Sequence, residues 1–322
     1  MKDNPRIVFF GTPEFAVDSL DLLVQNGYDI AAVVTAPDQP AGRGQQLHSS
    51  PVKIFARQHQ LAVLQPVNLK DPSFLDVLGK LRADLFIVVA FRMLPEAVWR
   101  MPPLGTFNLH ASLLPQYRGA APINHAIMNG DTETGLTTFF LQQQIDTGEI
   151  ILQEKMAIGP DETAGELHDR MKTKGASLVL KTVKVIESGN AATAKQHSLV
   201  PPGTILKTAP KIFREDCRLD WTAPIEDLYN KVRGLSPYPA AFTSFITPDG
   251  TQHLVKIYRS GKKTRQHSLP VPAIVTDGKT SLDVAVQGGF IEILQLQQTG
   301  KKAMATAEFL KGFRLNSDWK VG

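Results

Sequence analysis

R-I-V-F-F-G-T-P, residues 6–13, is the stretch that decides the fold class of this chain. Its apolar run predicts a buried strand from Arg6 to Phe10, and the Gly-Thr-Pro after it predicts a tight turn. A helical spacing of apolar residues follows from Glu14 to Gln25. A strand, a turn and a helix in this order form the first half of a βαβ unit, which predicts a parallel sheet.

Further strands are predicted along the first half of the chain. The run D-L-F-I-V-V-A, residues 84–90, is apolar without alternation, which is typical of a central strand covered on both faces. A helix is expected to begin near Pro51. Alternating strands and helices predict a doubly wound, mostly parallel sheet whose ligand crevice lies beyond the carboxyl ends of the strands. The other two predicted strands are Ile30–Thr35 and Val63–Leu64.

The glycine at the first turn invites a nucleotide-binding interpretation, because glycine lets the backbone approach a phosphate. Neither G-x-G-x-x-G nor G-x-x-x-x-G-K-[ST] occurs in this region. Gly11 therefore predicts a tight strand-to-helix turn, and we expect no bound dinucleotide.

Length and turn pattern predict two domains. At about 150 residues per domain, 322 residues correspond to about two. A polar, small-residue run from Gly189 to Ala194 and a Pro-Pro-Gly at 201–203 mark the boundary. We predict a catalytic domain at 1–189, a linker at 190–206 and a second domain at 207–322.

The second domain is predicted to be a small antiparallel β-barrel of OB-like architecture. A helix is expected around Pro224–Val232, and short alternating runs separated by Asp-Gly and Gly-Gly turns follow it. Such barrels often bind nucleic acids, although the fold alone does not establish function. The predicted strands are Thr243–Ile246, His253–Tyr258, Ala273–Thr276, Leu282–Val286 and Phe290–Gln295.

Composition places the chain among ordinary globular proteins, with 43% hydrophobic and 20% charged residues. Its single cysteine, Cys217, cannot form an internal disulfide. The start lacks the pattern of a signal peptide, and no apolar run reaches the roughly 20 residues that span a bilayer. We therefore expect a cytoplasmic protein without a membrane partner.

Basic charge is concentrated in the C-terminal part. From Val200 to Gly322 there are 17 Lys and Arg and 11 Asp and Glu, whereas the preceding residues hold 18 and 20. Clusters such as Lys262, Lys263 and Arg265 could neutralise backbone phosphates. A solvated surface explains the same charges, and on the charge count alone it is the stronger interpretation.

The chemistry is indicated by one predicted strand, Thr106–His110. Side chains alternate along a strand, so Asn108 and His110 project from the same face. An amide can donate to a developing oxyanion, and an imidazole can exchange a proton near neutral pH. Asp146, in a loop between two strand-like runs, could orient the imidazole and fix its tautomer.

Ordinary structural roles compete with each of these assignments. A lone histidine beside a strand end is more often a satisfied structural residue, and Asp followed by Thr-Gly is usually a turn. Asn108 could cap a helix. The catalytic interpretation gains weight because all three residues are predicted at one sheet edge, next to the Ser-Leu-Leu-Pro run at 112–115 and a glycine-containing exit turn.

At these residues the chain resembles the methionyl-tRNA formyltransferase family. The stretch N-L-H-A-S-L-L-P-Q-Y-R-G-A-A-P at 108–122 matches the family signature, and D-T-G at 146–148 matches a second segment. Segment 90–95 differs, because it is one residue shorter than the usual stretch and lacks its glycine. Further matches are G-T-P-E-F at 11–15, P-D-Q-P-A-G-R-G at 37–44, P-V-K at 51–53, L-D-W at 219–221 and G-K-K-A-M at 300–304.

The resemblance implies a formyltransferase-like variant of the Rossmann fold that acts in translation initiation. The formyl donor would be 10-formyltetrahydrofolate and the acceptor charged initiator tRNA, with no obligate protein partner. No metal is expected, since no Cys or His cluster has zinc spacing. The implied catalytic residues are Asn108, His110 and Asp146, the folate-binding residues are Ser112, Leu113, Leu114 and Pro115, and the tRNA-binding residues are Arg43, Lys211, Lys301 and Lys302.

For several of these residues an ordinary structural or surface role competes with the binding role. Exposed lysines usually need no partner, Arg43 by itself would be a solvated loop arginine, and one of Leu113 and Leu114 is expected to pack in the core.

Two other functions remain open at this point. A formyltransferase for a small amine, either an amino-sugar nucleotide or glycinamide ribonucleotide, would use the same three residues. The purine enzyme resembles only the first domain, and the A-G-R-G loop at 41–44 argues against an amino sugar. A catalytically silent RNA-binding protein has no chemical need for Asn108, His110 and Asp146 together.

Overall fold

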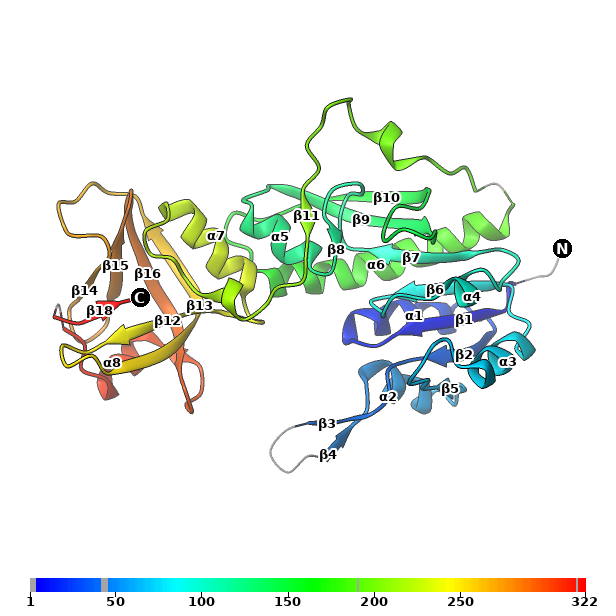
Figure 1. The fold of residues 1–322 in the computed structure, drawn as a ribbon, viewed down its shortest axis with the longest axis horizontal. Coiled ribbons are helices and arrows are strands. Elements are labelled where there is room, and N and C mark those ends of the chain that lie inside the picture. Colours follow the sequence, from blue (N-terminus) through cyan, green and yellow to red (C-terminus); the bar gives the residue numbers. More distant parts are fainter. Residues whose placement is uncertain (1–3, 42–45, 190, 317) are drawn as a thin grey trace. The chain divides into compact units, whose positions relative to one another are not determined.

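The computed structural model describes residues 4–41, 46–189, 191–316 and 318–322, which form two compact units (Figure 1). Each unit is assembled from three segments of the chain, so neither is continuous in sequence. The first unit consists of Met1–Gly119, Thr134–Met156 and His168–Thr208, and the second of Ala120–Glu133, Ala157–Leu167 and Ala209–Gly322.

A seven-stranded sheet organises the first unit, with the strand order β10-β9-β7-β6-β1-β2-β5. The pairs β1–β2, β1–β6, β2–β5 and β6–β7 are parallel, whereas β7–β9 is antiparallel. The predicted mostly parallel sheet is therefore confirmed. The strands are β1 (Ile7–Gly11), β2 (Ile30–Val34), β5 (Val63–Leu64), β6 (Leu85–Val89), β7 (Thr106–His110), β9 (Glu133–Phe140) and β10 (Ile150–Ala157).

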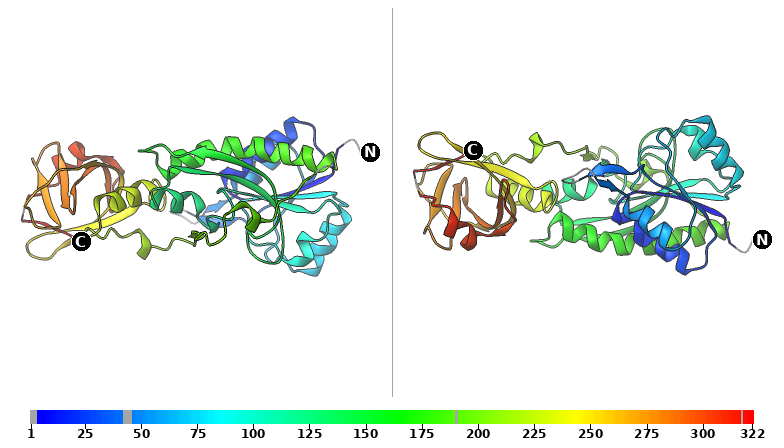
Figure 2. Two further views of the ribbon diagram at one scale, coloured as in Figure 1. Left: turned by 90° about the horizontal axis from the view of Figure 1, so that it is seen from above. Right: turned by 90° about the horizontal axis from the view of Figure 1, so that it is seen from below.

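Helices cover both faces of this sheet. Figure 2 shows α1 and α6 over one face and α3 over the other. All five residues of β1 are buried, and Val8 and Phe10 pack with Phe74 and Leu78 of α3, as expected for a strand covered on both sides. The helices of this part of the chain are η1 (Glu14–Ala16), α1 (Val17–Gln25), α2 (Pro51–Gln58), α3 (Pro72–Lys80), α4 (Glu96–Trp99) and α6 (Ala164–Glu187).

Gly11 ends β1 where the backbone turns tightly into η1. A Cβ added at this position would lie 2.7 Å from the Cβ of Ala16 and 3.2 Å from the carbonyl oxygen of Val89. Close packing of the turn thus accounts for the glycine, in agreement with the structural interpretation of the sequence.

A partly buried ion pair lies at the base of the hairpin formed by β3 (Gln39–Ala41) and β4 (Gln46–His48). Nζ of Lys53, whose side chain is 6% exposed, donates to Asp38 Oδ2 at 2.5 Å. Gln65 Nε2 donates to the other carboxylate oxygen at 3.0 Å. These hydrogen bonds, the one from Lys53 foremost, hold the pKa of the Asp38 carboxyl below its ordinary value of 3.8.

We expect the variant Asp38→Asn to lower the melting temperature at pH 7 by roughly 5 °C, because it leaves the buried Lys53 ammonium without a counter-charge. The lowered pKa of Asp38 means that its contribution is complete above the unfolded-state value of about 3.8. It is lost as the pH falls through the folded-state pKa. Urea unfolding at several pH values should therefore show the difference from the wild type shrinking below about pH 4.

Asp76→Asn is a matched control for this experiment, because Asp76 pairs with Lys80 at an exposed position. An exposed pair contributes little, so this control should unfold like the wild type. A constant gap between Asp38→Asn and the wild type from pH 7 to pH 3 would contradict the prediction.

An antiparallel, nearly closed barrel-like sheet forms most of the second unit, which confirms the predicted barrel (Figure 1). Strand order is β14-β15-β16-β13-β12-β18, and β17 pairs with β16. Three strands are longer than predicted. β12 begins two residues earlier, and β13 and β16 continue pairing beyond their alternating cores, with a register shift at Arg259. The strands are β12 (Ala241–Ile246), β13 (Gln252–Lys263), β14 (Ala273–Thr276), β15 (Leu282–Val286), β16 (Gly289–Gln298), β17 (Met304–Ala305) and β18 (Lys320–Val321).

The predicted helix is present as α7 (Ile225–Leu235), which packs on the barrel through Leu228 and Val232. Trp221 of the L-D-W motif belongs to the same core, and its indole N–H donates to Thr243 Oγ1 at 2.8 Å. This motif therefore serves the packing of the second unit. The remaining elements are β8 (Arg118–Gly119), α5 (Pro122–Met128), η2 (Gln196–Leu199), β11 (Thr208–Ala209), η3 (Glu215–Cys217) and α8 (Thr306–Gly312).

Across the described ranges, none of the helices has the length and apolarity that a passage through a bilayer requires.

Candidate active site

The strand β7 presents Asn108 and His110 on one face, as the alternation of its side chains predicts. Its neighbours are β6 on one side and β9 on the other, and Asn108 pairs in register with Val88 and Phe139. His110 is 6% exposed, whereas Asn108 is only half-buried. Within the described residues the Asn108 side chain makes no hydrogen bond, so its amide is available to a ligand.

His110 is held by a backbone carbonyl. Its Nε2 lies 2.9 Å from the carbonyl oxygen of Tyr117. A carbonyl can only accept, so Nε2 carries the proton in the neutral imidazole and Nδ1 carries the lone pair. The contact that fixes the tautomer is therefore made by Tyr117, where the sequence had suggested Asp146.

Asp146 nevertheless faces the imidazole. Its Oδ2 lies 3.9 Å from His110 Nδ1, which is ion-pair distance but longer than a hydrogen bond. The same oxygen accepts the backbone N–H of Gly119 at 3.0 Å. The structure thus brings all three predicted residues to one sheet edge, with the carboxylate beside the unprotonated ring nitrogen.

Backbone conformations around the imidazole are unusual. Tyr117 and Asp146 have φ angles of +60° and +53°, in the left-handed region that non-glycine residues rarely adopt. Gly148 admits no side chain, because a Cβ there would lie 1.6 Å from the carbonyl oxygen of Phe140. Strained positions of this kind cluster at functional sites, and the sequence D-T-G reflects the tight packing of this loop.

The Ser-Leu-Leu-Pro segment follows β7 directly in the chain and is mostly buried. Ser112 is fully buried, and its hydroxyl donates to the carbonyl oxygen of Gln116 at 2.6 Å. Leu114 packs in an apolar cluster with Phe139 and Ile150, and its backbone N–H donates to Thr137. The core role expected for one of the two leucines therefore falls to Leu114, while Leu113 is half-buried.

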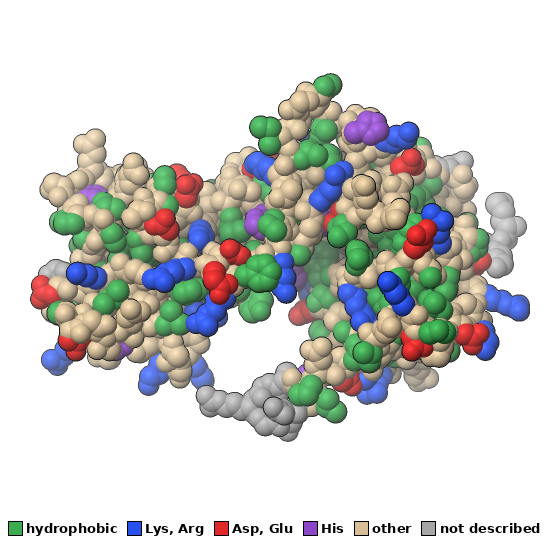
Figure 3. Space-filling model, viewed as in Figure 1, with side chains coloured by type: hydrophobic (Ala, Val, Ile, Leu, Met, Phe, Trp, Pro, Cys, Tyr) green, Lys and Arg blue, Asp and Glu red, His purple; other side chains and the backbone are tan. Residues whose placement is uncertain are grey.

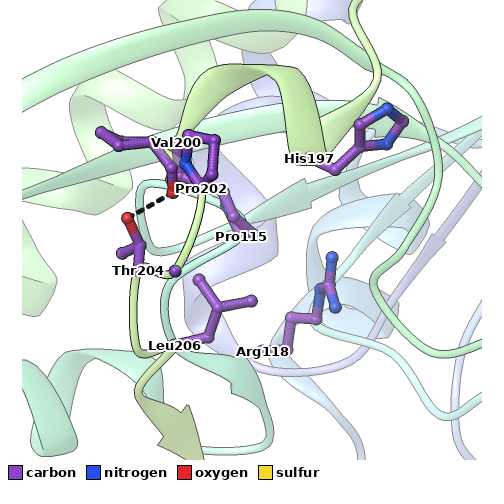
Figure 4. A pocket seen from close by; sticks show the side chains of 9 residues that line it. Pro115, Arg118, His197, Val200, Pro202, Thr204 and Leu206 are labelled. Atoms are coloured by element: carbon purple, nitrogen blue, oxygen red, sulfur yellow. Dashed lines mark hydrogen bonds between the residues drawn. The ribbon is translucent and has the colours of Figure 1, made fainter.

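Pro115 lines a cavity of about 460 Å³ in the first unit, a volume within the range of small-molecule sites (Figure 4). Arg118 and His197 are its charged or titratable side chains, and Val200 and Leu206 supply apolar wall. Within the lining segment, Thr204 Oγ1 donates to the carbonyl oxygen of Pro201 at 2.7 Å. The cavity involves a segment, 197–206, to which the sequence assigned only a linker role.

Residues 90–95, expected from the sequence to be one residue shorter than usual, leave β6 at the same sheet edge. Ala90 has a φ angle of +47°, a conformation that favours glycine. Arg92 anchors the segment by donating to the carbonyl oxygen of Val67 at 2.8 Å, and the Phe91 ring lies 5.7 Å from that of Phe10. These contacts hold the segment in place.

The predicted tRNA-binding residues have different surroundings. Arg43 lies outside the described residues. Lys211 is exposed, with Nζ 5.4 Å from the ring centre of Phe213. Lys301 and Lys302 are exposed between β16 and β17 and have no acidic partner among the residues that the structure describes. On the face shown in Figure 3, Lys and Arg side chains are scattered over both units.

Two lysines of the basic cluster are neutralised within the fold. Lys262 pairs with Glu226 at 2.6 Å, and Lys263 pairs with Asp283 and Glu292, both at 3.0 Å. For these two residues the interpretation as an ordinary protein surface is the better one.

Sequence reasoning missed two groups that complete the site, the carbonyl of Tyr117 and the side chain of Gln196. Tyr117 lies within the matched signature, but a backbone contact leaves no trace in residue type. Gln196 stands outside every motif and is buried. Among the described residues, no group of three or more His, Cys, Asp or Glu side chains could hold a metal ion.

Comparisons with known proteins agree with this fold. The family model described as formyl transferase matches residues 5–183, and that of the formyl transferase C-terminal domain matches residues 211–314. Among solved structures, WlaRD, a sugar 3N-formyl transferase, has a TM-score of 0.64 at 20% identity and covers 92% of this chain and 99% of its own. HypX from Aquifex aeolicus has a TM-score of 0.63 at 16% identity, covering 96% and 47%. Fold and family models thus define a formyl transferase.

Curated relatives of similar length identify the kind of formyl transferase. A methionyl-tRNA formyltransferase of Bacteroides fragilis is 52% identical over 320 residues, covering 99% of this chain and 98% of its own length. One of Phocaeicola vulgatus is 53% identical over 321 residues, covering 99% of each. The chain belongs to the methionyl-tRNA formyltransferase family.

Proposed function

We propose that this chain transfers the formyl group of 10-formyltetrahydrofolate to the free amino group of methionine on initiator tRNA, as a step of translation initiation. One observation carries the proposal. Asn108, His110 and Asp146 meet at the carboxyl edge of the sheet, in a chain about half identical over its length to proteins of that name. Such a substrate belongs to the cytoplasm, and the proposal requires neither a membrane nor an obligate protein partner.

The transfer joins the neutral methionyl amine to the formyl carbon. A C–N bond forms and the carbonyl oxygen becomes negatively charged. The bond from this carbon to the folate nitrogen then breaks, and that nitrogen takes up the proton that the amine has lost. No bond to the protein forms, and no metal takes part.

Each catalytic residue has one task in this scheme. The Asn108 amide donates a hydrogen bond to the charged oxygen, where a positioned donor stabilises the transition state. His110 moves the proton through Nδ1, because Nε2 is already engaged with the Tyr117 carbonyl. Asp146 balances the positive charge of the imidazolium from 3.9 Å.

The substrates are proposed to lie along the same sheet edge. Ser112, Leu113, Leu114 and Pro115 form the wall of the folate site, with Ser112 and Leu114 acting through the backbone that they hold. Charged tRNA is bound by Arg43, Lys211, Lys301 and Lys302. We retain the division into a catalytic domain at 1–189, a linker at 190–206 and a tRNA-binding domain at 207–322 as part of this proposal.

An acceptor comparison tests the function. The protein is incubated with 10-formyltetrahydrofolate and, separately, with charged initiator tRNA, uncharged initiator tRNA and an amino-sugar nucleotide. Formylated product is expected only with the charged tRNA. Equal turnover of the amino-sugar nucleotide would favour a small-amine formyltransferase, and no turnover of any acceptor would contradict formyl transfer altogether.

We expect the double substitution of Lys301 and Lys302 by alanine to weaken tRNA binding and to flatten its salt dependence. Each phosphate contact contributes about one to the slope of log Kd against log salt, so the slope should fall by roughly two. Filter binding of charged tRNA at several salt concentrations measures it. The matched control replaces Lys262 and Lys263 by alanine. It removes the same amount of positive charge, but these two lysines are paired with acidic residues within the fold. Equal slopes for both double variants would contradict the assignment.

A further inference from the structure

Gln196 joins the predicted linker to the catalytic loop. Its side-chain Nε2 donates to two backbone carbonyl oxygens, that of Asp146 at 2.8 Å and that of Gly148 at 2.9 Å. The two carbonyls belong to the residues on either side of Thr147, so one amide group forms hydrogen bonds with both ends of the D-T-G turn. Gln196 is 4% exposed, which is unusual for this residue type.

Arg118 binds the oxygen atom of the same side-chain amide. Its Nε and Nη2 donate to Gln196 Oε1 at 3.1 and 2.6 Å. Both donors and the acceptor oxygen of Gln196 are therefore engaged, and the amide cannot be turned over without placing its oxygen against two carbonyls. A buried polar group whose partners are all satisfied specifies one arrangement of the groups around it.

The backbone just before Gln196 is paired with the start of β10. Ala194 and Ile150 exchange two backbone hydrogen bonds, each of 2.9 Å, and Thr193 Oγ1 donates to the carboxylate of Glu149. Residues 193–196 consequently run alongside residues 146–150 as an additional short pairing. The position of Gln196 is set by this pairing and not by its own side chain alone.

Asp146 needs such support. Its φ angle of +53° is costly for a non-glycine residue, and its carboxylate must stay beside His110 Nδ1. The hydrogen bond from Gln196 fixes the orientation of the Asp146 carbonyl and hence of the peptide plane that follows it. We propose that Gln196 is a positioning residue for formyl transfer, which holds the Asp146 carboxylate in register with His110, and that Arg118 locks Gln196 in that role.

This inference rests on the proposed function, and its test separates the two. The wild-type protein is first assayed for formylation of charged initiator tRNA; absence of turnover there refutes the function and not the role of Gln196. The variant Gln196→Glu then keeps the shape and the Arg118 contact but replaces the two donors with carboxylate oxygens. A displacement of about 1 Å at a catalytic group can cost on the order of 100-fold, so we expect kcat to fall by about 10- to 100-fold. KM for both substrates should stay within about twofold.

A matched control makes the same chemical change two residues from Asp146. Gln144→Glu alters an exposed side chain of the same loop, so it introduces the same charge without touching the carbonyls of Asp146 and Gly148. Its kcat should equal that of the wild type. A similar loss of kcat in Gln144→Glu would refute the proposal, because added charge alone would then explain the effect.

A double-mutant comparison distinguishes positioning from a general loss of structure. If Gln196 acts through the Asp146 carboxylate, Gln196→Glu should cost little further kcat, less than about threefold, in an Asp146→Asn background. An equal fold loss of kcat in the two backgrounds would overturn the proposal.

Arg118→Lys provides a second test in case the Gln196→Glu variant does not fold. It replaces two donors with one, and we expect a loss of kcat of about three- to tenfold with unchanged KM.

Discussion

His110→Ala is expected to lower kcat for formyl transfer by about 100- to 10,000-fold, the range that positioned proton transfer contributes. Nδ1 is the only ring nitrogen left to exchange a proton, since Nε2 donates to the Tyr117 carbonyl. The same substitution should cost only about 1–3 kcal/mol of stability, because it removes one buried hydrogen bond to a backbone group. Single-turnover formylation of charged tRNA, together with thermal unfolding, measures both quantities.

His125 provides the matched control. Its Nε2 also lies against a backbone carbonyl, that of Pro210, at 3.0 Å, but it faces none of the proposed catalytic residues. This hydrogen bond is at an exposed position, so His125→Ala should cost no more stability than His110→Ala and leave kcat within a few fold of the wild type. If both variants lose turnover equally, His110 has a structural role and the proposed proton transfer is wrong.

Asn108→Ala is expected to lower kcat by about 100- to 1,000-fold, as the loss of one oxyanion donor does in other enzymes. The substitution should scarcely change the melting temperature, because the Asn108 side chain makes no hydrogen bond within the described part of the chain. Catalysis and stability are thus predicted to separate more clearly here than at His110. The same two assays report them.

Asn108→Asp tests the reason for that loss. The aspartate has nearly the same shape but presents only acceptors when ionised. A negative charge next to a developing oxyanion should make this variant no better than Asn108→Ala. Retention of more than about a tenth of wild-type kcat would show that shape matters and donation does not, contrary to the oxyanion role.

The sequence by itself determined the parallel sheet and the identity of the three central residues. The apolar residues 85–89 are all buried, as their run without alternation predicts, and the tight turn after β1 needs glycine for local reasons. Strand alternation places Asn108 and His110 on one face without any tertiary information. The short runs between turns likewise predicted the barrel, because period-two alternation requires one buried face.

Tertiary structure alone decided how the site is held and which charges remain free. The Tyr117 carbonyl contacts His110, 7 residues away in the sequence, and the Gln196 amide contacts Asp146, 50 residues away. Contacts with backbone groups leave no signature in residue type. Lys262 and Lys301 look alike in the sequence, yet only Lys262 has an acidic partner among the described residues. Local patterns specify secondary structure and the face a side chain occupies. Partners distant in sequence are chosen by the packing of the whole chain, which no local pattern encodes.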